Sequence, residues 1–122
     1  MKFASVRLVT DDFERLVSFY ALLAGTPATR LADGFAEVRL PGATLAISAE
    51  QLVRRFNAGA ATAAANRSAI LEFEVDDIDD VLARMGGAEL VMAPTVMPWG
   101  NRSLLIRDPD GSLVNVFSRP AA

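Results

Sequence analysis

The sequence contains no cysteine and no histidine among its 122 residues. Without cysteine there are no disulfides, no thiolate nucleophiles and no zinc–thiolate sites. Without histidine there is no imidazole to bind a transition metal. Long apolar runs are also missing, so no segment has membrane-spanning length, and the N-terminus lacks a signal-peptide pattern. We therefore expect a cytoplasmic protein with no membrane contact.

Clustered positive charge is missing as well. The chain has 12 Lys and Arg against 15 Asp and Glu, a formal charge of −3, and its basic residues are scattered. A protein that binds nucleic acid needs a basic face that neutralises phosphates, so we expect no nucleic-acid partner. Hydrophobic residues make up 52% of the chain, which is enough for the core of one compact domain.

What the chain does contain is a repeat. Residues 5–16 read SVRLVTDDFERL, and residues 70–81 read ILEFEVDDIDDV. Each stretch is a short alternating strand that leads into an Asp-Asp pair at the start of an amphipathic helix. Each half then ends in a hairpin with a glycine turn, at Gly42 and Gly111. A repeat of this size indicates two copies of one supersecondary unit.

The spacing predicts the same order of elements in both copies. In the first copy we expect a strand over 3–9 and a helix that starts with a capping box at Asp11 and Glu14 and ends at Gly25. In the second copy we expect a helix over 77–85 that stops at Gly86 and Gly87. The remaining expected strands are 28–31, 35–40, 44–48, 69–75, 88–94, 102–107 and 113–118.

The resulting fold class is α+β, with two βαβββ modules in one domain over 1–122. We expect module one at about 1–50, a linker at about 51–67 and module two at about 68–122. Residues 50–56 can form two helical turns, whereas 58–66 are alanine-rich and have no side chains to anchor a core. We interpret this segment as a mobile linker, with a lid or a subunit contact as alternatives.

Three phrases carry a family resemblance: DFERLVSFY at 12–20, FEVDDID at 73–79, and the stretch from PWGNR to DPDGSLVNV at 98–116. They resemble the vicinal oxygen chelate superfamily, which includes glyoxalase I, extradiol dioxygenases, fosfomycin-resistance enzymes and bleomycin-resistance proteins. The resemblance covers nearly the whole chain. It implies two βαβββ modules that form a cup-shaped mixed sheet with helices outside, usually completed in a homodimer.

Enzymes of this superfamily place metal ligands on the cup-facing side of the first and fourth strands of each module. The corresponding positions here are Ser5, Ala46, Ile70 and Asn115. Alkyl groups have no lone pair, and neutral Ser and Asn oxygens bind transition metals weakly. The resemblance therefore implies a member that lacks the metal ligands, and we expect no metal site and no cofactor.

The alternation of the strands indicates what the cup contains instead. If Ser5 and Asn115 face inward, the side chains two residues away do so too. This adds Arg7, Glu72, Glu74, Leu113 and Phe117, a mixture of charged and apolar groups that is typical of a small-molecule pocket. Arg7 and Glu72 either serve that pocket or form an ion pair that fills a closed cavity.

Trp99 is the only tryptophan, and it either packs as an anchor or stacks on a planar ligand at the rim of the cup. Asn101 and Arg102 are possible donors beside it, and Glu37 and Arg39 are further polar candidates. The predicted ligand-binding residues are Ser5, Arg7, Glu72, Trp99, Arg102, Asn115 and Phe117.

Two acidic stretches have simpler interpretations. The sequence DPDG at 108–111 is similar to part of a calcium loop, but the other ligand positions are absent, so we interpret it as a turn. The acidic run at 76–80 fits the start of a helix.

Three functions fit these observations. We favour a metal-independent homodimer that binds or sequesters a small organic ligand in its cup, as bleomycin-resistance proteins do. Its glutamates favour a cationic or amphipathic ligand. The second function is a metal-free lyase or isomerase with Glu72 or Glu37 as acid or base and Arg7 stabilising an enolate. The third is a degenerate module that binds a partner protein. No catalytic residue is assigned, and the sequence identifies neither the ligand nor whether modules pair within or across subunits.

Overall fold

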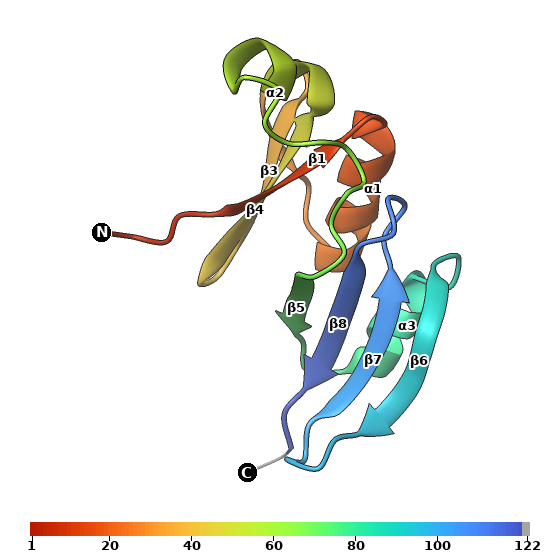
Figure 1. Cartoon of the computed structure of the whole chain (residues 1–122). Coiled ribbons are helices and arrows are strands. Elements are labelled where there is room, and N and C mark those ends of the chain that lie inside the picture. The colour runs from red at the N-terminus through yellow and green to blue at the C-terminus, as the bar shows by residue number, and fades with distance from the viewer. Residues whose placement is uncertain (121–122) are drawn as a thin grey trace. The chain divides into compact units, whose positions relative to one another are not determined.

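The computed structural model describes residues 1–120, in which the order βαβββ occurs twice with one short helix between (Figure 1). The chain separates into two compact units, one over Met1–Ala65 and the other from Asn66 onward. Among the described residues, no helix has the length and apolarity that crossing a bilayer requires.

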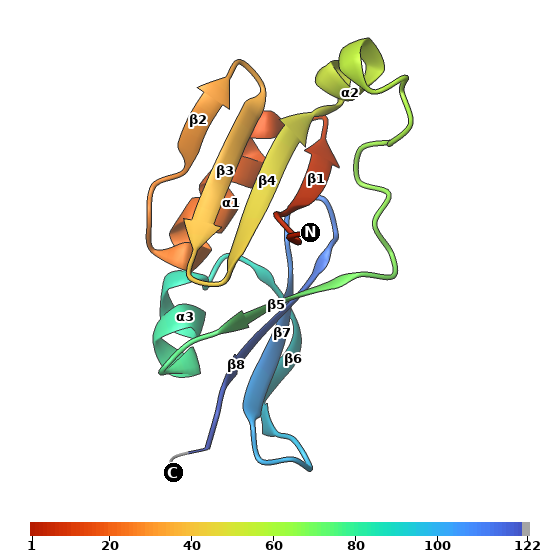
Figure 2. The same cartoon turned by 90° about the vertical axis from the view of Figure 1, so that its left-hand side faces the viewer.

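The first unit is a four-stranded mixed sheet with strand order β1-β4-β3-β2. β1 runs parallel to β4, and the other neighbouring pairs are antiparallel. Helix α1 packs on one face of this sheet, behind the strands in Figure 2, where Tyr20 and Leu16 are buried with Ile47 of the sheet. The elements are β1 (Val6–Thr10), α1 (Phe13–Ala24), β2 (Thr29–Ala32), β3 (Phe35–Leu40), β4 (Ala43–Ala49) and α2 (Glu50–Phe56).

The second unit repeats this arrangement with strand order β5-β8-β7-β6, in which β5 runs parallel to β8. Helix α3 packs on one face, seen behind the strands in Figure 1, where Ile78 and Val81 are buried with Val116 of the sheet. The elements are β5 (Ile70–Glu74), α3 (Ile78–Arg84), β6 (Glu89–Val96), β7 (Arg102–Arg107) and β8 (Leu113–Ser118). The predicted α+β class with two βαβββ modules is confirmed.

The duplication extends to the pairing of the strands. In the first sheet Arg7 pairs in register with Ala46, and in the second sheet Glu72 pairs with Asn115. These residues are equivalent in the repeat, because Arg7 and Glu72 both lie five positions before the second aspartate of their Asp-Asp pair. The two modules therefore share one register, and a position in one identifies its counterpart in the other.

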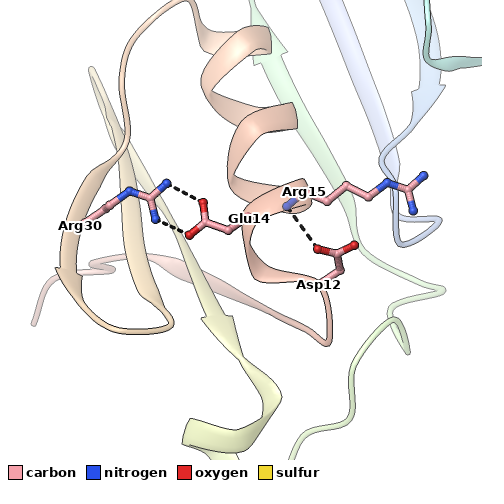
Figure 3. Close-up of polar contacts among 4 residues, drawn as sticks. All are labelled: Asp12, Glu14, Arg15 and Arg30. Atoms are coloured by element: carbon pink, nitrogen blue, oxygen red, sulfur yellow. Dashed lines mark hydrogen bonds and ion pairs between the residues drawn. The ribbon is translucent and has the colours of Figure 1, made fainter.

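The predicted start of the first helix at Asp11 is wrong by one residue. The N-cap of α1 is Asp12, not Asp11, and its Oδ1 accepts from the backbone N–H of Arg15 at 3.4 Å (Figure 3). Asp77 caps α3 in the same way and accepts from the N–H of Asp79 at 2.9 Å. In both copies the second aspartate of the pair is therefore the cap.

The turn between β7 and β8 agrees with its prediction. Asp108 is buried, and its Oδ1 accepts from the backbone N–H groups of Asp110 and Ser112, both at 2.9 Å. Gly111 has φ 88°, a left-handed conformation that favours glycine. The carboxylate of Asp108 thus stabilises its own turn by accepting these backbone hydrogen bonds.

The segment after β4 has two parts. The predicted helical turns form α2, whose Glu50 accepts from the backbone N–H of Ala63 at 2.5 Å. The N–H of Ala64 donates to the carbonyl of Val9 on the edge strand β1 at 3.4 Å. These bonds connect residues 63–64 to α2 and β1. The interpretation of 58–66 as a linker, lid or subunit contact stays a prediction.

Candidate functional site

Each sheet has one face that packs against α1 or α3 and one face turned away from that helix. We call the latter the first open face, on the sheet of β1–β4, and the second open face, on the sheet of β5–β8. The alternation of burial assigns the side chains, since Leu8 and Ile106 are buried on the helix side while Arg7 and Arg107 are more exposed. The predicted polar residues can be placed against these two faces.

The first open face holds its arginine in a fixed position. Arg7 donates from Nη2 to Oδ1 of Asn57, the residue that caps the C-terminus of α2, at 2.9 Å. Its guanidinium carbon lies 5.8 Å from the ring centroid of Phe35, within reach of a cation–π contact. Glu37 and Arg39 form an ion pair beside it at 2.9 Å. The guanidinium of Arg7 is therefore held between an amide and an aromatic ring.

The second open face has a carboxylate held by an amide. Asn115 donates from Nδ2 to Oε2 of Glu72 at 2.9 Å. The other amide atom, Asn115 Oδ1, is buried and has no hydrogen-bond partner. Around this pair lie apolar side chains that are partly exposed, including Ile70, Leu105 and Phe117. The pair is a small polar centre among these apolar side chains.

A second carboxylate lies one step further along β5. Glu74 forms an ion pair with Arg119 at 3.1 Å, and the guanidinium carbon of Arg119 lies 5.5 Å from the ring centroid of Phe117. Arg119 follows the end of β8 and lies two residues after Phe117. Sequence reasoning missed Arg119, although the alternation along β8 could have indicated it.

Four of the seven predicted residues, Arg7, Glu72, Asn115 and Phe117, lie on the open faces. Ser5 precedes the first residue of β1 and is exposed. Arg7 and Glu72 each bond to a residue of their own unit, Asn57 and Asn115. Asn57 was missed because a contact between β1 and the end of α2 leaves no trace in the sequence pattern.

Arg102, predicted as a donor beside Trp99, forms an ion pair with α3, and its role toward a ligand stays a prediction. Its Nη1 bonds Oδ2 of Asp79 in α3 at 3.0 Å, so it lies on the helix side of the sheet. The reason is the period of the strand, because Arg102 shares its face with Leu104 and Ile106, which are fully buried. Arg102 holds α3 against β7 and does not belong to the second open face.

Trp99 does not pack as an anchor among the described residues, because 70% of it is exposed. It lies in the turn between β6 and β7, where the N–H of Gly100 bonds the carbonyl of Met97 at 2.8 Å. An exposed tryptophan in a turn is available to a ligand or to another chain. Its predicted place at the rim of a ligand site stays a prediction.

The residues at the expected metal positions do not fit a metal ion. Ala46 lies beside Arg7, and Asn115 has its amide nitrogen directed to Glu72. Within residues 1–120, no group of three or more His, Cys, Asp or Glu side chains is placed to hold a metal. The donor set of the metal-dependent relatives is thus not reproduced, and no reaction step through a metal follows from these residues.

A separate ion pair lies on the helix side of the first unit. Arg30 of β2 makes two bonds to the carboxylate of Glu14 in α1, at 2.8 and 2.7 Å (Figure 3). The hydrogen bond from Arg30 lowers the pKa of Glu14 below its ordinary value. An open cavity of about 310 Å³ adjoins this pair, lined by Phe13, Glu14, Arg30, Leu31, Ala32, Asp33 and Gly34.

Comparison with known proteins agrees with this architecture. The family model described as the Glyoxalase/Bleomycin resistance protein/Dioxygenase superfamily matches residues 2–116. The chain therefore belongs to this superfamily, and the resemblance noted in the sequence is confirmed. A search of the curated proteins gives no match.

Solved structures show the same fold. A glyoxalase/bleomycin resistance protein/dioxygenase family enzyme from Burkholderia phytofirmans PsJN has a TM-score of 0.84 at 16% identity, covering 98% of this chain and 100% of that one. A glyoxalase-related enzyme from Fulvimarina pelagi has a TM-score of 0.82 at 20% identity, covering 98% and 89%. A glyoxalase/bleomycin resistance protein/dioxygenase from Nocardioides has a TM-score of 0.77 at 26% identity, covering 100% and 89%.

Proposed function

We propose that this protein binds an organic molecule on an open sheet face and needs no metal ion to do so. The observation that carries the proposal is the second open face, where Glu72 and Asn115 form a polar centre among partly exposed apolar side chains. A mostly apolar surface with a few oriented polar groups is the usual composition of a small-molecule site.

The polar groups of each open face are held in place before any ligand arrives. On the second open face Asn115 fixes one oxygen of Glu72. On the first open face Asn57 and Phe35 fix the guanidinium of Arg7. Side chains that are already ordered lose less conformational entropy on binding than free ones do. This arrangement supports recognition of a ligand by fixed charges.

Metal independence rests on the chemistry of the residues at the expected ligand positions. Ser5, Ala46 and Ile70 offer at most one neutral hydroxyl, and Asn115 offers a neutral amide. Binding sites for transition metals in proteins use imidazole, thiolate or carboxylate groups. The proposed ligand is therefore recognised by the protein's own charges and apolar surface.

A homodimer in the cytoplasm belongs to the same proposal. Support for the dimer comes from the edge strand β6 and the turn that follows it, where Val96 and Trp99 are 66% and 70% exposed and Leu90 is 47% exposed. Exposed apolar side chains along one edge are typical of an interface with another chain. The cytoplasmic location rests on the sequence alone.

The proposal is tested by ligand binding to protein treated with EDTA. Benzamidine, benzamide, benzoate and a set of larger planar compounds would be titrated while the emission of Trp99 is recorded. Equilibrium dialysis then verifies each hit by a method that does not depend on tryptophan. We expect saturable binding of at least one compound without added metal. Binding that appears only after a divalent metal is restored would overturn the proposal.

A matched pair of variants locates the ligand. Ile70 lies on the second open face and is 50% exposed, whereas Leu22 lies on α1 and is 51% exposed. Both changes to alanine remove a similar amount of accessible apolar surface. We expect Ile70→Ala to weaken binding by about fivefold, because apolar contact with the ligand is lost, and Leu22→Ala to leave it unchanged. Equal effects of the two would place the ligand elsewhere.

A further inference from the structure

The end of the second open face already holds a cation supplied by the chain itself. The guanidinium of Arg119 lies 3.1 Å from Oε1 of Glu74 and 5.5 Å from the ring centroid of Phe117. A carboxylate beside an aromatic face is a usual way in which proteins bind organic cations, since both groups attract positive charge. Arg119 therefore shows what kind of group this part of the face accepts.

The polar atoms next to this cation are acceptors. Glu72 lies two residues before Glu74 on the same face of β5, which places the two residues about 6.6 Å apart along the strand. Among residues 1–120, Glu72 has no cationic partner, and its one bond comes from Asn115. The Asn115 amide is directed to that bond, and its Oδ1 is buried. The carboxylate of Glu72 is therefore the group that a ligand meets, and a ligand that satisfies it must bring donors.

We propose that the ligand of the second open face is an organic cation, a guanidinium, amidinium or ammonium group on an apolar body, and that Arg119 occupies the head-group position until the ligand displaces it. This inference rests on the proposed function and names the chemical class of its ligand. Glu74 and Phe117 take the head group in exchange for Arg119, the carboxylate of Glu72 accepts its remaining hydrogens, and Ile70 and Leu105 contact the apolar body.

Displacement of Arg119 is feasible because the contact is weak. The side chain of Arg119 is 64% exposed and that of Glu74 is 52% exposed. Exposed ion pairs and exposed cation–π contacts are each of modest strength, since water competes with them. An internal group that competes with a ligand lowers the apparent affinity by the fraction of molecules in which the site is occupied. Removal of Arg119 should therefore tighten cation binding.

The chain offers a matched control for this test. Arg30 pairs with Glu14 and lies 5.8 Å from the ring centroid of Phe13, which is the same combination of groups. That trio is on the helix side of the first unit and not on the open face of its own sheet. Arg30→Gln therefore frees a carboxylate and an aromatic ring of the same kind at a place where we expect no ligand.

The test uses the full chain, calorimetric titration with benzamidine, and amide chemical-shift mapping by NMR. Benzamide serves as the neutral ligand of nearly the same shape. We expect Arg119→Gln to bind benzamidine about fivefold more tightly than the unmodified protein. We expect Glu74→Gln to bind it about fivefold more weakly, and Arg30→Gln to bind it equally well. The shifts should centre on Glu74 and Phe117, and benzamide should produce none of these effects.

Each other result overturns the inference. If Arg119→Gln has no effect, or if Arg30→Gln has the same effect, Arg119 is not an internal ligand. If benzamide or benzoate binds the second open face while benzamidine does not, the ligand class is wrong although the proposed function stands. If no compound of any charge binds, the proposed function itself fails. Circular dichroism of each variant confirms that the fold is retained.

Discussion

At the scale of single residues, the Asp-Asp pairs show that neighbouring identical side chains have different tasks. Asp12 and Asp77 accept hydrogen bonds from the first turns of α1 and α3. Their neighbours Asp11 and Asp76 are exposed and do not cap either helix. The sequence alone favoured Asp11 because Glu14 follows it at the capping-box distance, but the backbone enters the helix one residue later.

Replacing the capping aspartates should lower stability, and replacing their neighbours should not. We expect Asp12→Ala and Asp77→Ala each to lower the free energy of unfolding by about 1 kcal/mol, because a helix N–H loses its acceptor. Asp11→Ala and Asp76→Ala should change it by less than about 0.5 kcal/mol. Urea unfolding followed by circular dichroism measures all four variants. A larger effect at Asp11 than at Asp12 would restore the capping box to Asp11.

At the scale of elements, the segment from α2 to residue 65 is bound more firmly than its composition indicates. Glu50 accepts from the N–H of Ala63 and pairs with Arg54 at 2.6 Å, so one carboxylate joins both ends of the segment. Alanine-rich sequence indicates a mobile linker, because alanine side chains provide no anchor. The anchors are backbone groups instead, and periodicity carries no information about them. Ala58 and Ala64 also have φ near 55°, a region that non-glycine residues rarely adopt.

The hydrogen bond between the Glu50 carboxylate and the N–H of Ala63 should depend on pH. The hydrogen bond from the Ala63 backbone holds the pKa of Glu50 below its ordinary value of 4.5. A group whose pKa is lowered by folding stabilises the folded state above its unfolded pKa, and that contribution disappears as pH falls through the folded pKa. We therefore expect the amide proton shift of Ala63, followed by NMR, to titrate with a midpoint below 4.5. It should be insensitive to pH in Glu50→Gln. A midpoint at or above 4.5 would show that the bond is not formed in solution.

At the scale of the whole molecule, the fold follows from the repeat and much of the site does not. The strands 35–40, 102–107 and 113–118 have the predicted boundaries, because strict alternation and glycine turns define them. Alternation also placed Glu72, Asn115 and Phe117 on one face. Arg102 was predicted as a donor beside Trp99, and its ion pair with Asp79 depends on the position of α3, which the strand pattern does not give. Contacts such as Arg7 with Asn57 depend on where α2 ends in space, which local pattern does not determine.

The missing metal ligands lead to a test of the whole chain. The triple change Ser5→His, Ile70→His and Asn115→Glu places metal-binding side chains at the positions expected from the superfamily. If these positions converge in the folded protein, the variant should bind Zn²⁺ or Ni²⁺ while the unmodified chain does not. Calorimetric titration of both proteins measures the difference. A folded variant without metal affinity would show that these three residues are not the ligand positions.

The shared register of the two sheets has one more consequence. Equivalent points in the two copies carry Arg7 beside Ala46 and Glu72 beside Asn115, so the backbone repeats while the charge is reversed. Each open face, taken by itself, therefore presents a different charge to its surroundings. Duplication by itself would produce two modules with equivalent open faces. Here single side chains make the two faces different without altering the pairing of any strand.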